Sequence, residues 1–250
     1  ARLVDATGLV NWQRAVKSDE ELAYMRKAAR ISEKIIDGIA ERVEPGLLKH
    51  ELVAEIYADA IRGIGAAWGD YPAIVPLLPS GTNAAAPHLT WNSDPFRTGE
   101  ATFFEISGCY RRYHAPLCRT VFLGTPPRHI RDAEAALVEG LEAGIKAARS
   151  GNTAGDVARA LARPLERAGI ERSARAGYPV GLSYPPDWGE RTISIRPEDD
   201  SELKAGMTFH FMPGLWMNDW GMEITETILI RPDGAAECLC DRPRKLFVKA

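Results

Sequence analysis

The order of helical and β-rich segments limits the fold most, because it occurs twice along the 250-residue chain. Amphipathic helical segments at about 18–45 and 47–63 precede one β-rich stretch, and segments at about 128–148 and 153–168 precede another. Helices and strands grouped in this way pack as layers around a shared core. The repeat predicts an α+β fold.

The two units are also matched where their best strands begin. A glycine, Gly99 or Gly206, stands shortly before a phenylalanine in each unit. We expect one domain over 1–250, made of halves at about 18–124 and 128–232. Their sheets would join into one curved antiparallel sheet, with a cleft on the concave side and the helices on the convex side.

Local signals set the expected elements. Ser18 and Glu21 form a capping-box pattern, which marks the start of a helix. The apolar stripe of the first helix comprises Leu22, Met25, Ala29, Ile36 and Ile39, and that of the second comprises Leu52, Ile56, Tyr57 and Ile61. Gly108 interrupts the first β-rich stretch, which predicts a hairpin bent at this glycine, and 222–230 has the pattern of one alternating strand.

Composition and charge exclude several classes of function. The 31 basic and 34 acidic residues give a net charge of -3, which supplies no long-range field for nucleic acid or anionic lipid. No apolar run approaches the length that spans a bilayer, and the N-terminus lacks a signal-peptide pattern. The cysteines, Cys109, Cys118, Cys238 and Cys240, show no metal-site spacing. We therefore expect a cytoplasmic protein that binds neither nucleic acid nor a membrane.

Glu105 is the first candidate for chemistry, because it interrupts the apolar strand TFFEIS. A buried carboxylate is costly unless it is paired or hydrogen-bonded, so its presence favours a function or a structural ion pair. Strand alternation would place it on the same face as Phe103.

Three histidines could act beside this carboxylate. His88 follows the turn-rich segment PSGTNAAAP, where a site residue is more common than a packing residue. An imidazole with its ordinary pKa of about 6.5 suits proton transfer near neutrality. His114 and His210 lie in the two β-rich regions, where a histidine is as often a hydrogen-bonded core residue as a catalytic one.

Glu223 and Glu226 occur in the alternating segment GMEITET. Alternation directs them to opposite faces, so one would face the cleft and the other solvent, and the sequence leaves open which. Four loop tryptophans could wall a site for a cationic ligand or could cover the ends of strands, namely Trp91, Trp188, Trp216 and Trp220.

These residues lie in five blocks that resemble the catalytic domain of the creatinase/prolidase/methionine aminopeptidase family over nearly the whole chain. The blocks are PSGTNAAAPH, GEATFFEISGCYRRYHAPLCRTVFLG, AGYPVGLSYPP, KAGMTFHFMPGLW and GMEITETILIRPDG. The resemblance implies the pita-bread fold, a hydrolase and a homodimer.

In the peptidase members of this family, two metal ions are held by two Asp, one His and two Glu. The resemblance places those ligands at Glu105, Pro116, Tyr178, Met212 and Thr225. Proline and methionine offer no hard oxygen ligand. We therefore expect no metal and no other cofactor, and a dinuclear peptidase site is disfavoured.

The segment TFHFMPGLWMNDWGMEITET is most similar to metal-free members that open the cyclic amidine ring of ectoine to N-acetyl-2,4-diaminobutyrate. The resemblance implies covalent catalysis by Glu105 with His88 as proton shuttle. The predicted substrate-binding residues are Tyr178, His114, His210, Trp216, Glu223 and Glu226. Members of this branch carry a further N-terminal domain, which we expect to be missing here.

Three other functions stay open. A creatinase-like amidinohydrolase acting on another small guanidino or amidine solute would have a similar site. A non-catalytic pita-bread module that binds proteins would hold Glu105 and His88 far apart or in structural bonds. A peptidase with an unusual metal is the third.

Overall fold

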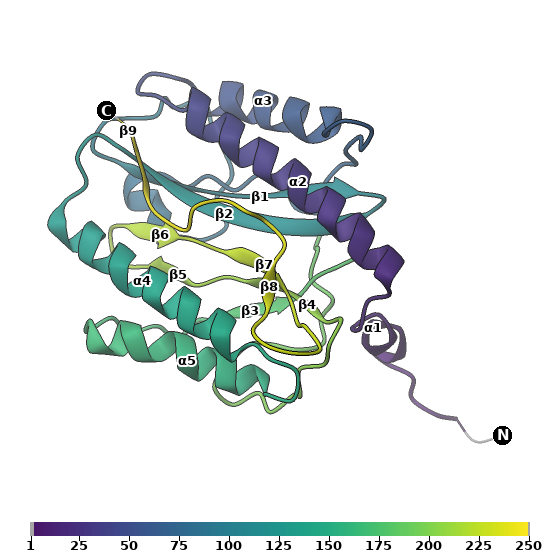
Figure 1. Cartoon of the computed structure of the whole chain (residues 1–250). Coiled ribbons are helices and arrows are strands. Elements are labelled where there is room, and N and C mark those ends of the chain that lie inside the picture. The colour runs from purple at the N-terminus through teal and green to yellow at the C-terminus, as the bar shows by residue number, and fades with distance from the viewer. Residues whose placement is uncertain (1–2, 250) are drawn as a thin grey trace.

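The computed structural model describes residues 3–249, in which two helix pairs and their strands follow the expected order (Figure 1). The first part contains α1 (Leu9–Gln13), α2 (Asp19–Arg42), α3 (Lys49–Arg62), the 3-10 helix η1 (Gly81–Ala85), β1 (Ala101–Tyr110) and β2 (Tyr113–Leu123). The second part contains α4 (Arg128–Ala147), α5 (Ala154–Arg167), β3 (Gly177–Pro179), β4 (Thr208–Phe211), β5 (Gly214–Trp216), β6 (Gly221–Glu223), β7 (Glu226–Leu229), β8 (Glu237–Cys238) and β9 (Phe247–Lys249).

The strands form three hydrogen-bonded groups in the orders β1-β2-β9, β3-β4-β7-β8 and β5-β6. All pairs are antiparallel except β2 with β9. In Figure 1, α2 and α3 lie over the β1–β2 hairpin, whereas α4 and α5 lie over the strands of the second half. The predicted α+β class is confirmed.

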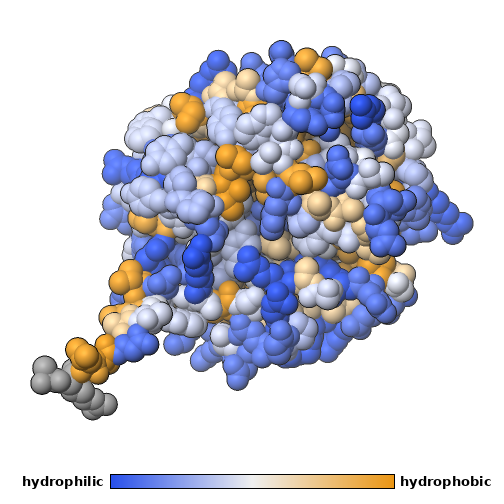
Figure 2. Space-filling view, turned by 180° about the vertical axis from the view of Figure 1, so that it is seen from behind, coloured by the Kyte–Doolittle hydropathy of each residue, from blue (hydrophilic) through white to orange (hydrophobic). Residues whose placement is uncertain are grey.

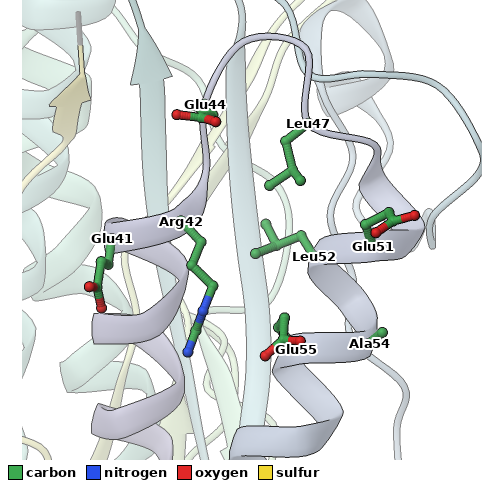
Figure 3. Close-up of a pocket in the computed structure, with 8 residues that line it drawn as sticks. All are labelled: Glu41, Arg42, Glu44, Leu47, Glu51, Leu52, Ala54 and Glu55. Carbon is green, nitrogen blue, oxygen red and sulfur yellow. The ribbon is translucent and has the colours of Figure 1, made fainter.

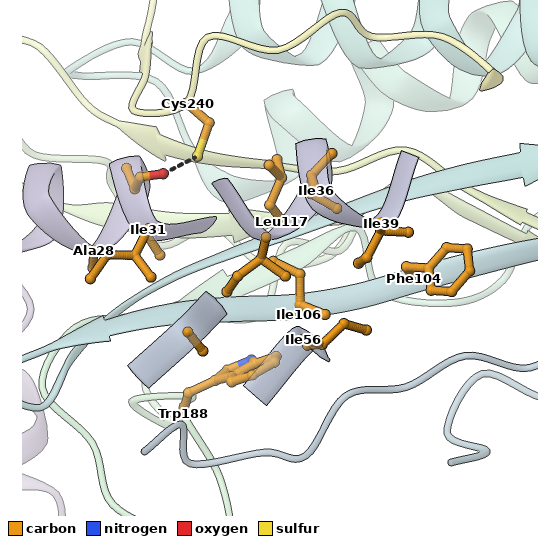
Figure 4. Packing of buried hydrophobic residues seen from close by; sticks show 14 of the residues in the cluster. Ala28, Ile31, Ile36, Ile39, Ile56, Phe104, Ile106, Leu117, Trp188 and Cys240 are labelled. Atoms are coloured by element: carbon orange, nitrogen blue, oxygen red, sulfur yellow. Dashed lines mark hydrogen bonds between the residues drawn. The ribbon is translucent and has the colours of Figure 1, made fainter. Parts of the chain in front are cut away.

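The capping box and the stripe of α2 explain how the first layer forms. The Ser18 side chain accepts a hydrogen bond from the Glu21 amide, and the Glu21 carboxylate accepts one from the Ser18 amide. The buried face of α2 then packs on Phe104, Ile106 and Leu117 of the hairpin (Figure 4). Each isoleucine or leucine buried in this way stabilises the fold by about 1.5–3 kcal/mol relative to an exposed side chain.

The stripe of α3 differs from the prediction at its last position. Ile61 is 49% exposed, whereas Asp59 and Ala60 are buried. Leu52, Ile56 and Ala60 recur every four residues, so the buried face turns away from Ile61. A second core, separate from the α2 layer, unites α4 and α5 with the strands of the second half.

The predicted bend at Gly108 is wrong, because β1 continues through it to Tyr110. The turn lies at Arg111 and Arg112, whose φ values of 49° and 68° suit the twist of a two-residue hairpin. Gly108 is needed for a different reason: a Cβ there would lie 2.2 Å from the Ala28 carbonyl oxygen. Its missing side chain lets α2 pack directly on the strand.

The predicted strand 222–230 is also wrong in one respect, because β6 and β7 are separated at Ile224 and Thr225. Thr225 turns toward β2, where its amide donates to the Cys118 carbonyl (3.1 Å) and its hydroxyl accepts from the Cys118 amide (2.8 Å). The Thr120 hydroxyl bonds both the amide and the carbonyl of Glu223 at 2.9 and 2.8 Å. These bonds join the two halves along one seam.

The N-terminal segment projects from the body of the molecule (Figures 1 and 2) and exposes Leu3, Val4, Leu9 and Val10. All four cysteines are free thiols. Among residues 3–249, no helix combines the length and apolar character needed to cross a membrane.

Candidate functional site

Glu105 lies in a buried polar cluster on the seam between the two halves. Its side chain is on β1, opposite Cys118 of β2, and the residue is only 6% exposed. One carboxyl oxygen, Oε1, lies 3.8 Å from Nδ1 of His210 on β4. His210 is paired in register with Tyr178 on β3, so three strands bring these side chains together.

The imidazole of His210 connects two hydroxyl groups. Its Nδ1 lies 3.0 Å from the Tyr178 hydroxyl, and its Nε2 lies 2.8 Å from the Thr225 hydroxyl. The Tyr178 hydroxyl also accepts a hydrogen bond of 2.8 Å from the Trp188 indole. Either neutral tautomer satisfies these contacts, because each hydroxyl can donate to the ring nitrogen that lacks the proton. The group can therefore move a proton between the two sides of the ring.

Burial sets the charge state of this cluster. It lowers the pKa of His210 to about 3, with a further contribution from the positive charge of Arg175, so the imidazole is neutral at pH 7. Burial raises the pKa of Glu105 to about 7, against an opposing effect of Arg175. The carboxyl group of Glu105 thus exchanges its proton close to neutrality.

Glu223 is the acidic residue of GMEITET that faces this cluster. It is 1% exposed, and neither of its carboxyl oxygens has a hydrogen-bond partner in the described part of the chain, although the Cys118 thiol faces it. Burial and the nearby Glu105 raise its pKa well above the usual value, while Arg172 acts in the opposite direction. An unpartnered buried carboxyl group is ready to accept hydrogen bonds from a ligand.

Glu226 lies on the other face of the sheet, but the expectation that this second glutamate faces solvent is wrong. It is fully buried, and one oxygen accepts a 2.6 Å bond from Arg119. The Arg119 guanidinium also donates to the carbonyls of Cys118, Thr225, Arg242 and Pro243. Glu226 is therefore a partner of Arg119 and is not brought to Glu105.

The other two histidines stand apart from this contact network. Nε2 of His114 accepts a hydrogen bond of 2.9 Å from the Ala73 amide, and burial lowers the pKa of His114 to about 4. Its ring is 6.1 Å from the ring of Trp188, which in turn is 6.4 Å from that of His210. His88 is exposed in the turn after η1 and makes none of the hydrogen bonds of the Glu105 cluster.

The four loop tryptophans divide into two groups. Trp188 is fully buried beneath Tyr178, and Trp216 packs beside Phe103 with its indole N–H unpartnered among the described residues. Trp91 packs on Tyr57 of α3, and Trp220 packs on His129 of α4. Only the first pair belongs to the Glu105 cluster.

Sequence reasoning did not assign roles to three members of the cluster, Thr225, Arg172 and Arg175. Thr225 follows Glu223 closely and is oriented by the strand break, which the alternation of GMEITET conceals. The two arginines precede the block AGYPVG, and their spacing in RSARAGYP was the available signal.

The residues at the positions of the family's metal ligands do not suit a metal ion. The Pro116 carbonyl accepts a 2.7 Å bond from the Thr227 hydroxyl, the Tyr178 phenol has a strongly raised pKa, and Met212 offers a thioether. Among residues 3–249, no three His, Cys, Asp or Glu side chains gather in a way that could hold a metal. Hard divalent ions require several carboxylate or imidazole ligands.

A separate groove of about 400 Å³ lies between the end of α2 and the start of α3 (Figure 3). It is lined by acidic residues, Glu41, Glu44, Glu51 and Glu55, together with Arg42, Leu47, Leu52 and Ala54. Arg42 already pairs with Asp59 at 2.8 Å. The groove contains none of the predicted site residues, and we assign no chemistry to it.

The chain matches the family model "Metallopeptidase family M24" over residues 23–232. It is 56% identical to "Ectoine hydrolase" of Halomonas elongata, over 100% of this chain and 64% of that protein. Its structure is similar to those of an Xaa-Pro dipeptidase from Bacillus anthracis (TM-score 0.88, 20% identity, 100% of this chain and 68% of the other) and a dipeptidase from Pyrococcus horikoshii (TM-score 0.85, 27% identity, 99% and 67%).

These similarities confirm the predicted pita-bread fold, in which each half contributes a helix pair and strands. The chain spans 64% of the length of the Halomonas relative. The activity of that longer protein is therefore not assigned to this chain by similarity alone. The family model, by contrast, covers most of the chain. This chain belongs to the metallopeptidase family M24.

Proposed function

We propose that this chain hydrolyses the cyclic amidine ring of ectoine to N-acetyl-2,4-diaminobutyrate, without a metal ion and through a covalent bond to Glu105. The observation that carries the proposal is the buried carboxyl group of Glu105, which lies 3.8 Å from His210 in a chain whose residues at the other family ligand positions do not suit a metal ion. The 56% identity to an ectoine hydrolase supports the choice of substrate.

The first half of the reaction forms and opens an adduct. A carboxylate oxygen of Glu105 attacks the amidinium carbon, and the electron pair of the carbon–nitrogen π bond moves to nitrogen. One ring carbon–nitrogen bond then breaks, and its nitrogen leaves as an amine after it takes up a proton. The product is an imidate esterified to Glu105, so one difficult hydration is split into two easier steps.

Water completes the second half. Its oxygen bonds to the imidate carbon while the imidate nitrogen gains a proton and the water loses one. The bond to the Glu105 oxygen then breaks while the remaining hydroxyl proton passes to the amine released in the first half, which restores the carboxylate and yields the amide and an ammonium group. The Tyr178–His210–Thr225 group is suited to these proton transfers because it is neutral and hydrogen-bonded on both sides of the ring. The assignment of His88 as proton shuttle stays a prediction.

The test follows ectoine by NMR in the presence of a chelator, with wild-type protein, Glu105→Ala and Glu105→Gln. The matched control is Glu142→Gln, at an exposed position of α4. We expect ring opening by the wild type and the control, none by the Glu105 variants, and an intact-mass increase of one ectoine in quenched wild-type samples. Activity that disappears with the chelator and returns with added metal would refute the metal-free mechanism.

The creatinase-like alternative is favoured by the unpartnered Glu223 carboxyl group, which can bind any delocalised cation. Turnover of creatine in place of ectoine would transfer the proposal to that activity. The expected homodimer and cytoplasmic location accompany the proposal, and the mass of the folded protein in solution tests the first.

A further inference from the structure

Arg175 is a positive charge at the edge of the Glu105 cluster, and it forms no ion pair with any residue of 3–249. Its guanidinium lies over the Tyr178 ring, with 4.4 Å between its central carbon and the ring centroid. The side chain is exposed, and within the described residues it makes no salt bridge and donates no hydrogen bond. Its charge acts on Glu105, Tyr178 and His210: it opposes the rise that burial causes in the pKa of Glu105 and Tyr178, and it adds to the lowering of the pKa of His210.

The neighbouring Arg172 has the opposite character. Its guanidinium donates to four carbonyl oxygens, those of Gly214 (2.9 Å), Ala174 (2.6 Å), Arg175 (2.8 Å) and Met212 (3.2 Å). Four of its five N–H donors are therefore used on backbone carbonyls, and it holds the backbone that carries Arg175. The next residue, Ala176, is held by bonds of 2.7 Å to Ile195 and to Met212. The backbone on both sides of Arg175 is thus held by hydrogen bonds, whereas its guanidinium donates none within the described part of the chain.

The cluster also contains buried polar groups that have no hydrogen-bond partner among the described residues. The Glu223 carboxyl oxygens are buried and accept no hydrogen bond among the described residues, and the indole N–H of Trp216 is buried and unpartnered as well. Glu223 lies near enough to Glu105 for that carboxyl group to raise its pKa, and Arg175 stacks on Tyr178, whose hydroxyl contacts His210 beside Glu105. Buried polar groups left without partners mark places where a ligand completes the hydrogen bonding.

We infer that this site selects zwitterions, with Arg175 binding the ligand's carboxylate and Glu223 binding its delocalised amidinium or guanidinium cation. The inference rests on the proposed function. It adds that Arg175 makes a carboxylate group on the substrate a requirement for tight binding. Arginine suits this task because its planar fork matches a carboxylate in a bidentate geometry. An amidine that lacks the carboxylate would engage Glu223 alone.

The test measures binding by calorimetry in a Glu105→Gln background, where no covalent step can occur. The probes are ectoine, creatine and 2-methyl-1,4,5,6-tetrahydropyrimidine, which is ectoine without its carboxylate. Adding Arg175→Gln should weaken binding of the carboxylated probes by about 10- to 100-fold, the effect of losing a charged hydrogen-bond pair. Binding of the decarboxylated probe should change by less than about twofold. Arg163→Gln, at an exposed position of α5, is the matched control and should leave all three affinities unchanged.

Equal weakening of carboxylated and decarboxylated probes by Arg175→Gln would overturn the inference, and so would ectoine binding that Arg175→Gln leaves unchanged. Wild-type turnover of ectoine distinguishes the two proposals. If ectoine is hydrolysed but its binding ignores Arg175, the inference fails and the function stands. If creatine binds through Arg175 while ectoine is neither bound nor hydrolysed, the function fails and the inference stands. Failure of all three probes to bind overturns the inference, and the absence of ectoine turnover by the wild type in the same series overturns the function as well.

Discussion

Replacing Glu105 by glutamine should stabilise the protein above neutral pH and have little effect in acid. Burial raises the pKa of Glu105 from 4.5 to about 7. Between these values the unfolded chain releases the proton and the folded chain retains it, so the free energy of unfolding falls as pH rises. At 1.36 kcal/mol per pKa unit, the full loss is ~3 kcal/mol above pH 7. Glutamine carries no charge and avoids this loss.

Thermal unfolding of wild type and Glu105→Gln, recorded from pH 4 to pH 8, tests this reasoning. For a chain of this size, ~3 kcal/mol corresponds to a difference in melting temperature of roughly 6 to 12 °C. The difference should be small near pH 4, grow between pH 4.5 and pH 7, and then stay constant. The control Glu142→Gln should follow the wild type within about 1 °C. A difference that is the same at every pH would refute the assigned burial effect on Glu105.

Three further outcomes follow from the site. The kcat/KM for ectoine should rise with pH through about 7, because the nucleophilic form of Glu105 is the carboxylate; a flat profile from pH 5 to pH 9 would contradict this. His210→Ala should lower kcat by about 10²- to 10⁴-fold, as expected for lost proton transfer. If His88→Ala causes a loss of that size and His210→Ala does not, the proton-transfer group is His88, in the turn after η1, and not His210. Glu226→Ala should reduce the free energy of unfolding in urea by about 3–5 kcal/mol, because it leaves the Arg119 guanidinium buried without its partner; unchanged stability would show that water reaches this arginine.

The fold could be predicted because periodicity and caps act locally. The Ser18 capping box, the stripe of α2 and the helix pair repeat depend on neighbouring residues, and all appear as expected. Gly108 was misinterpreted because a glycine in a strand signals either a bend or a close approach, and only the position of α2 decides between them.

The site could be predicted only in part for a similar reason. Glu105 stood out because a carboxylate among apolar residues is costly, whatever its surroundings. The surroundings of Glu223 and Glu226 depend on β2, which is about a hundred residues away in sequence. Arg119 of β2 pairs with Glu226, and Cys118 of β2 lies beside the unpartnered Glu223. The strand break at Thr225 is produced by those long-range contacts, so alternation within GMEITET could not reveal it.

The seam between the two halves also ties activity to the cooperativity of unfolding. Glu105 comes from the first half and His210 from the second, and the bonds from β2 to Thr225 and Glu223 hold them in register. An intermediate in which only one half is folded would keep much of its ellipticity and yet contain no complete catalytic group. Turnover that remains at a given denaturant concentration therefore reports only the molecules in which both cores are folded. If turnover is lost at a lower denaturant concentration than the helical circular-dichroism signal, the two halves separate before either of them unfolds.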